Sequence, residues 1–422
     1  MNLADLHKRR RQSLSAPVAE ALEAALAGYE LEREQALALA QVRGTELEAL
    51  MGVADYLREQ HCGEEASYVV NRNVNFTNVC IKRCTFCAFS RDHRLEEGYY
   101  LPQEEVLRRI HEAVELGATE VCVQAGLPPK MDGSLYIDLT RAIKARFPQL
   151  HLHAFSPEEV LYGAIRSRSS ISHYLKQLKE AGLDSLPGTS AEILDQDLRD
   201  KIAPGRITVE QWTEVIESAH ELGLPTTSTM MFGHLEEPRH WVDHMLYLRR
   251  LQKRNGGFSE FVPLSFVHQE APMMARLEGV RAGATGAEVV LVHALARVLL
   301  GAHLRNIQAS WVKEGPKLAQ LLLAAGCNDL GGTLINESIS TSAGASFGQL
   351  VPPAELRRIL RDAGRLPVQR NTLYGVLRRF EAEPAEPDAL DQVHDPEGRF
   401  GSFHQLVAAK EHRFVHPLRV LS

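Results

Sequence analysis

Short hydrophobic runs alternate with longer amphipathic stretches between about residue 70 and about residue 365. The short runs have the length and β-branched content of buried strands, and the longer stretches repeat apolar residues along one helix face. We expect strands at 74–80, 119–126, 150–155, 183–188, 226–233, 260–266, 306–312 and 329–333. We expect helices at 103–116, 135–146, 209–222, 238–252, 287–300 and 317–325. This alternation indicates a parallel sheet, because each parallel crossover needs a return segment.

The number of expected strands separates two parallel architectures. Eight strands with about eight helices match a (β/α)8 barrel of the TIM type, which usually takes ~250 residues. The alternative, a doubly wound open sheet, usually carries a glycine-rich phosphate turn after its first strand, where this chain has cysteines. We therefore expect an α/β fold in which residues 66–366 form the barrel.

Two further segments flank the expected barrel. Residues 1–65 are rich in Ala and Leu, and Thr45 and Glu48 have the spacing of a helix capping box. We expect this segment to form a helical cap. Residues 367–422 contain acidic runs with proline and carry no catalytic motif, so we expect a loop-rich C-terminal extension.

Composition and charge argue against several classes of protein. The 422 residues carry 47 basic and 54 acidic side chains, a net charge of −7, whereas nucleic-acid binding usually leaves a basic footprint. No run approaches the ~20 apolar residues of a membrane-spanning helix, and no apolar segment follows the basic residues 8–11 as in a signal peptide. We expect a cytoplasmic protein with neither nucleic acid nor membrane as a partner.

Three of the six cysteines, Cys80, Cys84 and Cys87, lie within eight residues of one another. In a long chain in a reducing compartment, such a group indicates a metal site or redox chemistry rather than a disulfide framework. Thiolates select zinc or iron–sulfur clusters, and a closed zinc site would need a fourth ligand, for which His93 is the nearby candidate. Three cysteines on a [4Fe–4S] cluster leave one iron open for a ligand. The loop follows the carboxyl end of a strand, where barrel enzymes have their active sites.

The C-x3-C-x-F-C loop resembles the signature of the radical S-adenosylmethionine superfamily. The resemblance implies that Cys80, Cys84 and Cys87 hold a [4Fe–4S] cluster and that Phe86 lies near the adenine of S-adenosylmethionine. In that superfamily the amino and carboxylate groups of S-adenosylmethionine chelate the open iron. One electron from the cluster then cleaves a carbon–sulfur bond, giving methionine and a 5′-deoxyadenosyl radical. A non-catalytic iron–sulfur or zinc protein is the alternative from a different class.

The same resemblance implies that residues after the second expected strand contact S-adenosylmethionine. Gln124 can donate or accept a hydrogen bond, and Gly126 lets the backbone approach a ligand, although a plain turn glycine is an equal alternative. The segment reads Ala-Gly-Leu-Pro-Pro and has no acidic residue, unlike a typical methionine-binding segment.

After the fourth expected strand, a Gly-Thr-Ser-Ala-Glu run resembles a cofactor-binding segment of the superfamily. We assign Thr189, Ser190, Glu192 and Arg199 to S-adenosylmethionine by that resemblance. Glu192 is expected in the first turn of a helix capped by Thr189 or Ser190, on one face with Arg199. Stabilisation of the helix N-terminus is the alternative explanation for Glu192.

Polar residues at the remaining strand ends indicate a polar substrate rather than a lipid. The candidates for proton transfer are His153, His234 and His268. His153 shares a strand face with His151, although a lone histidine is more often a packed residue. The candidate substrate contacts are Thr229, Ser265, Ser310, Asn336 and Glu337.

Longer segments resemble the family of tyrosine-using subunits of FO synthase, which makes the deazaflavin FO of coenzyme F420 biosynthesis. The resemblance runs from about residue 60 to about residue 370 and is carried by 71–91, 120–139, 153–163, 185–195, 226–234, 260–268 and 331–340. It implies that L-tyrosine loses a 4-hydroxybenzyl fragment, which adds to 5-amino-6-(D-ribitylamino)uracil, and releases 2-iminoacetate. With a single cysteine motif, the chain resembles the stand-alone subunit, whose functional partner is a second, ring-closing radical enzyme.

The nearest alternative within the superfamily is aminofutalosine synthase of menaquinone biosynthesis, which has a similar cysteine loop. The Ser-Trp-Val-Lys-Glu-Gly run at 310–315 and the Asn-Glu-Ser-Ile-Ser run at 336–340 favour the FO synthase family.

Overall fold

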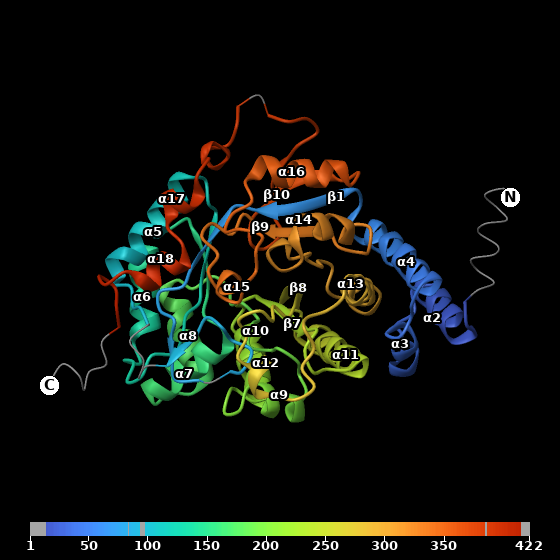
Figure 1. Cartoon of the computed structure of the whole chain (residues 1–422), viewed down its shortest axis with the longest axis horizontal. Helices are drawn as coiled ribbons and strands as arrows, with labels where there is room; N and C mark the ends of the chain where they lie inside the picture. Colours follow the sequence, from blue (N-terminus) through green and yellow to red (C-terminus); the bar gives the residue numbers. More distant parts are fainter. Residues whose placement is uncertain (1–13, 83, 93–97, 385, 415–422) are drawn as a thin grey trace.

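The computed structural model describes residues 14–82, 84–92, 98–384 and 386–414 (Figure 1). Three N-terminal helices, α2 (Ala16–Leu26), α3 (Arg33–Leu39) and α4 (Thr45–Cys62), lie together at one side of the molecule. The capping box expected at Thr45 and Glu48 is wrong, because α4 begins at Thr45 itself and its N-cap is Gly44 without a side-chain bond.

The central strands run parallel, as the alternation predicts. They are β1 (Glu65–Val69), β2 (Asn71–Val74), β3 (Val79–Cys80), β4 (Arg91–Asp92), β5 (Glu120–Val123), β6 (His151–Ala154), β7 (Thr226–Phe232), β8 (Phe258–Ser265), β9 (Asp329–Gly332), β10 (Leu366–Arg370) and β11 (Val376–Arg379). In the described residues they form four ladders, with the orders β11–β10–β1–β9, β2–β5–β6, β3–β4 and β7–β8. Only β11 is antiparallel to its neighbour.

Single parallel bridges join these ladders in the order of a TIM-like barrel. They connect Arg72 with Ile335, His153 with Ser185, Leu186 with Thr226, Phe261 with Ile307, and Gln308 with Asp329. The strands expected at 183–188 and 306–312 therefore contribute only isolated bridges, and Trp311 already begins a helix. The strand expected at 74–80 is divided between β2 and β3, because the chain leaves the ladder after Val74.

Helices surround the strands, with α16 lying over β1 and β10 (Figure 1). The longer ones are α5 (Gln103–Glu115), α6 (Leu135–Arg146), α7 (Pro157–Ser167), α8 (Ile171–Ala181), α10 (Val209–Glu221), α11 (Pro238–Asn255), α13 (Gly286–Leu300), α14 (Trp311–Leu322) and α16 (Pro353–Asp362). The shorter ones are α9 (Gln196–Ile202), α12 (Met273–Arg276), α15 (Ile339–Ser342), η1 (Ala389–Gln392), α17 (Pro396–Phe400) and α18 (Phe403–Ala408).

Both flanking segments are continuous with the central sheet. The expected boundary at 65/66 falls inside β1, and the boundary at 366/367 falls inside β10, which pairs with β1. After β11 the chain passes through η1, α17 and α18, and Phe403 packs against Phe89 just beyond the cysteine loop. The last described helix therefore reaches the neighbourhood of the predicted metal site.

A buried ion pair inside the barrel joins Asp329, the first residue of β9, to Arg370, the last residue of β10. Arg370 donates two hydrogen bonds to Asp329, at 2.6 and 2.9 Å, and Ser67 donates a third to the same carboxylate at 2.6 Å. The Arg370 guanidinium lies 3.9 Å from the ring centroid of Tyr374, whose hydroxyl donates to Glu260. These side chains form the floor of the barrel.

We expect Asp329→Asn to lower the free energy of unfolding by about 3 kcal/mol, because it removes the carboxylate that accepts two hydrogen bonds from the buried Arg370 and leaves only Glu260, at 3.6 Å, as a counter-charge. Urea denaturation followed by circular dichroism measures the change. The control is Asp138→Asn, which removes a carboxylate that is 55% exposed and paired only on the surface of α6. It should cost less than about 1 kcal/mol. Equal losses in the two variants would contradict a structural role for the floor.

Candidate active site

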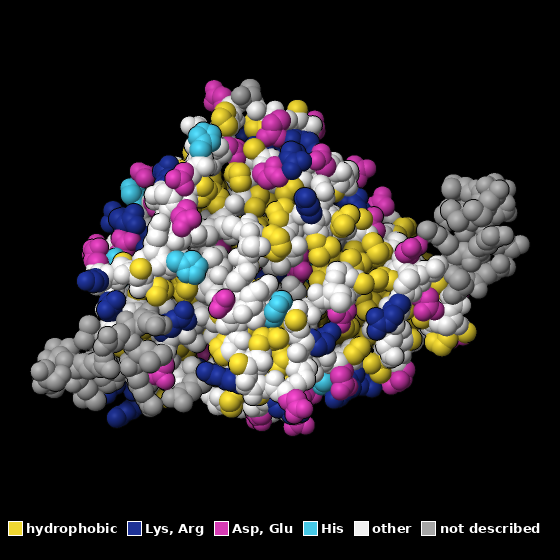
Figure 2. All heavy atoms as spheres, in the orientation of Figure 1, with side chains coloured by type: hydrophobic (Ala, Val, Ile, Leu, Met, Phe, Trp, Pro, Cys, Tyr) yellow, Lys and Arg dark blue, Asp and Glu magenta, His cyan; other side chains and the backbone are white. Residues whose placement is uncertain are grey.

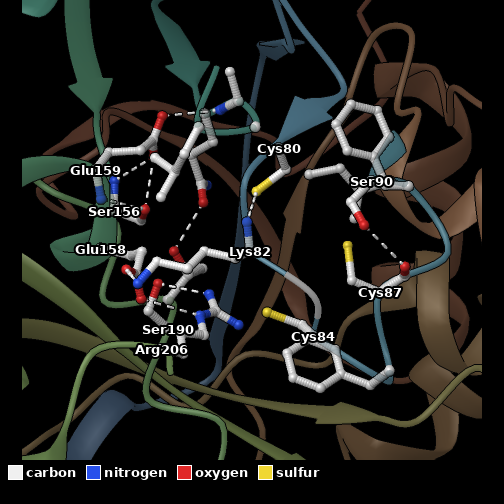
Figure 3. Close-up of a pocket in the computed structure, with 18 of the residues that line it drawn as sticks. Cys80, Lys82, Cys84, Cys87, Ser90, Ser156, Glu158, Glu159, Ser190 and Arg206 are labelled. Carbon is white, nitrogen blue, oxygen red and sulfur yellow. Dashed lines mark hydrogen bonds and ion pairs between the residues drawn. The ribbon is translucent and has the colours of Figure 1, made fainter. Parts of the chain in front are cut away.

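The three clustered cysteines line one cavity of about 210 Å³ at the carboxyl ends of the strands (Figure 3). Cys80 ends β3, and Cys84 and Cys87 follow in the loop. Thr85 fixes this loop to α9, because its backbone N–H and its hydroxyl both donate to the Ile202 carbonyl, at 2.9 and 2.7 Å. His93, the fourth ligand that a zinc site would need, lies outside the described residues.

The chemistry of these thiols fits a metal cluster. Burial raises the pKa of Cys80, and it raises the pKa of Cys84 to about 12, with Arg206 opposing the shift. Such thiols give up their protons when they bind iron. Among the described residues, no group of three or more Cys, His, Asp or Glu side chains is arranged to hold a single metal ion. The three thiols line one cavity, an arrangement that the ligands of a shared multi-iron cluster require.

Charged side chains form the wall of the cavity across from Cys87 (Figure 3). Arg206 pairs with Glu192 at 2.7 Å and donates to the Ser190 hydroxyl at 2.8 Å. Its guanidinium lies 5.4 Å from the centroid of the Phe86 ring. Burial opposes ionisation of Arg206, but Cys84 and Glu192 raise its pKa, so the guanidinium stays charged. The structure thus brings Ser190, Glu192 and Phe86 together, as the sequence predicts.

Two parts of the prediction for this segment are wrong. Residues 190 and 192 have φ angles of 68° and 45°, so the run is not helical, and α9 begins only after its N-cap Asp195. The buried Arg199 does not line the cavity; it donates to the Ala191 and Ile207 carbonyls. Arg206 takes the place expected for Arg199, because the loop after α9 turns back toward the cysteines.

The sequence analysis missed a buried carboxylate beside the Ala-Gly-Leu-Pro-Pro segment. Glu159 accepts hydrogen bonds from the Ala125 N–H at 2.9 Å and from the Ser156 N–H at 2.8 Å and hydroxyl at 2.7 Å. Burial raises its pKa to about 7, and the bonds from Ser156 and Ala125 oppose the shift. Thus α7 supplies the acid that the segment itself lacks. Its signal in the sequence is the Ser156-x-x-Glu159 capping box.

Gly126 makes a close approach to the cysteine loop possible. Its N–H donates to the Thr77 carbonyl at 2.8 Å, and a Cβ atom here would lie 2.4 Å from the Val79 carbonyl oxygen. Any larger residue would push the segment away from β3. Gly126 therefore shapes the cavity, and the plain-turn alternative does not explain this contact.

A second cavity of about 210 Å³ occupies the interior of the barrel. Its lining includes the predicted residues His153, Thr229, Ser310 and Glu337. Gln124 and Thr189 line both cavities, and the Thr189 hydroxyl donates to the Gln124 side-chain oxygen at 2.8 Å. This hydrogen-bonded pair marks the boundary between the two cavities.

His153 is held in its neutral form inside this second cavity. Burial lowers its pKa to about 4, against the opposing effect of Glu120. Its Nδ1 atom is hydrogen-bonded to the Ser185 hydroxyl at 2.7 Å. A neutral imidazole can accept a proton, so His153 retains the properties of a candidate base.

The remaining predicted residues line neither cavity. His234 is fully buried beside Glu236, and the Ser265 N–H faces Glu314 at 3.3 Å. Asn336 donates to the Phe400 and Gly401 carbonyls, so it holds the C-terminal segment in place. His268 also lies outside both cavities. Cavity residues that the sequence analysis did not assign are Lys82, Glu158, Glu159 and Arg206 in the first, and Glu120, Glu260, Gln308, Lys313 and Arg370 in the second.

Residues 74–248 match the model of the radical SAM superfamily, and residues 255–382 match the model described as "CofH/MqnC C-terminal region". A 5-amino-6-(D-ribitylamino)uracil–L-tyrosine 4-hydroxyphenyl transferase of Methanothermobacter thermautotrophicus is 51% identical over 82% of this chain and 94% of its own length. The chain belongs to this family of radical SAM transferases. A second transferase of the family, from Methanopyrus kandleri, is 50% identical over 78% of this chain and 92% of its own length.

A longer relative and two solved structures also match this chain. The FO synthase of Mycobacterium leprae is 47% identical over 81% of this chain, which spans 40% of that longer protein. Among solved structures, HydG, a maturase of the [FeFe]-hydrogenase, matches 88% of this chain and 80% of its own with a TM-score of 0.66 at 17% identity. Methylornithine synthase matches 83% of this chain and 97% of its own at a TM-score of 0.63 and 18% identity. These matches confirm the TIM-like α/β fold.

The face seen in Figure 2 has no basic patch, and the described residues include no membrane-spanning helix. On the face seen in Figure 2, basic and acidic side chains are interspersed. Within the described residues, no helix is both long and apolar enough to cross a membrane.

We expect Cys80→Ala, Cys84→Ala and Cys87→Ala each to abolish cluster binding, because a three-thiolate site loses a ligand. Iron and sulfide per chain after anaerobic reconstitution measure the effect. The matched controls, which should keep wild-type iron, are Cys62→Ala, Cys122→Ala and Cys327→Ala. Loss of iron from the control variants as well would show that the clustered thiols are not the specific ligands.

Glu159 should give the apo-protein a distinct pH dependence. Its pKa is raised from 4.5 to about 7 in the folded chain, which therefore binds the proton more tightly than the unfolded chain. The stability that protonated Glu159 contributes therefore falls as the pH rises from 4.5 to about 7, and it stays constant at higher pH. From about pH 5.5 to about pH 8, the wild type should lose about 2 kcal/mol relative to Glu159→Gln.

Urea unfolding of both proteins across this range tests the expectation. Glu104→Gln, on the exposed first turn of α5, is the control. Its free energy of unfolding should change with pH as that of the wild type does. A Glu159→Gln profile that also runs parallel to the wild type would show that Glu159 is already ionised at low pH.

Proposed function

We propose that this chain joins the 4-hydroxybenzyl group of L-tyrosine to 5-amino-6-(D-ribitylamino)uracil in the formation of the deazaflavin FO. The products are 5-amino-5-(4-hydroxybenzyl)-6-(D-ribitylimino)-5,6-dihydrouracil, 2-iminoacetate, methionine and 5′-deoxyadenosine. The observation that carries this proposal is the 51% identity to a transferase of that name along 94% of its length. The two adjoining cavities support it, because the reaction needs a cofactor and two organic substrates in contact.

The first cavity has the residues to hold the cofactors. Cys80, Cys84 and Cys87 would bind the [4Fe–4S] cluster, which together with S-adenosylmethionine supplies a 5′-deoxyadenosyl radical when bound. Arg206 offers a charged guanidinium for a carboxylate, and Glu159 offers a carboxylate for an amine. Glu159 is buried and the Arg206 side chain is only 15% exposed, so their interactions with a cofactor would be weakly screened by solvent.

The second cavity has the polar lining that the two substrates require. Thr227, Thr229 and Gln308 can donate and accept hydrogen bonds, and Glu260 accepts them. A uracil ring and a ribityl chain present the complementary groups. Because Gln124 and Thr189 line both cavities, a reactive species formed in the first would be separated from the second only by this pair of side chains. The floor formed by Arg370 and Asp329 closes the opposite end.

His153 is the strongest of the three proton-transfer candidates. It is neutral and lines the second cavity, whereas His234 and His268 do not. We assign it the role of accepting a proton from bound substrate. Ser185 fixes its ring through the hydrogen bond to Nδ1.

Two further aspects of the assignment belong to this proposal. The FO synthase relatives are longer chains, of which this one spans 40%. We propose a ring-closing radical enzyme as the functional partner that completes the deazaflavin. We also propose 66–366 as the catalytic unit, with 1–65 and 367–422 as flanking parts. Aminofutalosine synthase is less well supported, since three relatives that are 45–51% identical to this chain carry the transferase name.

The reconstituted protein tests the proposal in one reaction. With dithionite, S-adenosylmethionine, tyrosine and the diaminouracil, mass spectrometry should detect 5′-deoxyadenosine and the hydroxybenzyl–uracil adduct. The control omits tyrosine and should give no adduct. Absence of 5′-deoxyadenosine would overturn the radical chemistry, whereas 5′-deoxyadenosine without the adduct would overturn only the choice of substrates.

A further inference from the structure

Lys313 differs from the other fixed cations that line the two cavities. Lys82 pairs with Glu158 at 3.1 Å, and Arg206 and Arg370 each pair with a carboxylate at 2.7 Å or closer. Among the residues that the structure describes, the Lys313 ammonium group has no hydrogen-bond or ion-pair partner, although Lys313 lines the second cavity. Burial lowers the pKa of Lys313, because a charged group is costly to remove from water. A cation left unpaired in a cavity is suited to an anionic group on a ligand.

The local backbone fixes Lys313 at the cavity wall. It lies in the first turn of α14, after the N-cap Ser310, and Gly315 breaks the helix with a φ angle of 77°. A Cβ atom at Gly315 would meet the Phe347 ring at 2.6 Å, so the kink cannot straighten with a larger residue. The turn that carries Lys313 is therefore separated from the rest of α14.

Glu337 faces the same cavity with the opposite charge. It is 4% exposed, and its carboxylate accepts hydrogen bonds from the Ser340 N–H at 2.9 and 3.0 Å. Lys313 lowers the pKa of this carboxyl while burial raises it, so the two groups interact across space. They do not form an ion pair, although both line the second cavity. Space between two such groups suits a ligand that carries both charges.

We propose that Lys313 binds the carboxylate of the substrate amino acid and that Glu337 receives its α-ammonium group. The pair would select a zwitterionic amino acid over an amine or a carboxylic acid with the same ring. This inference rests on the proposed function, because it assigns the binding of tyrosine within that reaction.

The location of Lys313 gives the amino acid an orientation. Ile339, two residues after Glu337, lines the first cavity, so the pair of Lys313 and Glu337 lies on the side of the second cavity that faces the cofactor residues. The charged end of the amino acid would then lie beside the cofactor cavity. The phenol would point into the barrel, where His153 and Thr229 line the wall. The Cα–Cβ bond that breaks would lie between these two regions.

Direct binding measurements test the assignment without turnover. Equilibrium dialysis of labelled tyrosine uses the reconstituted protein with S-adenosylmethionine and no reductant. Lys313→Met should weaken binding of tyrosine about 10- to 100-fold, as expected for a lost charge-assisted hydrogen bond. Tyramine, which lacks the carboxylate, should bind the variant as it binds the wild type. Lys317→Met, the same substitution at an exposed site on α14, is the control and should leave both ligands unaffected.

Glu337→Gln provides the reciprocal test and keeps an acceptor for the Ser340 N–H. The variant should bind tyrosine and tyramine more weakly than the wild type does. Its affinity for 3-(4-hydroxyphenyl)propionate, which lacks the amine, should be unchanged. The assignment would be overturned if Lys313→Met bound tyrosine with wild-type affinity. It would also be overturned if this variant lost affinity for tyrosine and tyramine to the same extent. A wild type that cleaves S-adenosylmethionine but binds no tyrosine would overturn the proposed substrate, and the inference with it. If Lys313→Met does not fold, the ligand pattern of Glu337→Gln still decides the matter.

Discussion

The ion pair between Arg370 and Asp329 allows this barrel to have a polar interior that is closed at one end. Each charge alone would be costly to bury. The two hydrogen bonds from Arg370 to Asp329 and the third from Ser67 offset that cost. Because β10 and β9 supply the two residues on either side of β1, the pair also ties three neighbouring strands together. The floor leaves the carboxyl ends of the strands as the side on which the cysteine loop lies.

The two cavities share a wall rather than lying at separate places in the fold. Gln124 follows β5 and Thr189 follows the bridge at Leu186, so two positions of the barrel on either side of β6 supply the pair between the cavities. A radical is useful only if it meets its substrate before it meets solvent. The arrangement places the predicted cofactor residues and the predicted substrate residues on two sides of a single hydrogen bond.

The sequence predicted the parts of this protein that depend on local spacing. The cysteine loop and most of the strand and helix order follow from such spacing, whereas Ser190 and Glu192 were assigned by family resemblance and line the first cavity. Arg206, Glu159 and Lys313 were missed, because their roles come from contacts between segments far apart in the chain. The helix expected at Glu192 was wrong, since the left-handed φ angles at 190 and 192 depend on contacts that no periodicity records.

Asn336 links the last described part of the chain to the substrate cavity. It donates to the carbonyls of residues 400 and 401, and its neighbour Glu337 lines the cavity. During synthesis, the cysteine loop leaves the ribosome more than three hundred residues before those carbonyls do. The metal ligands are therefore made long before the wall of the substrate cavity is supported.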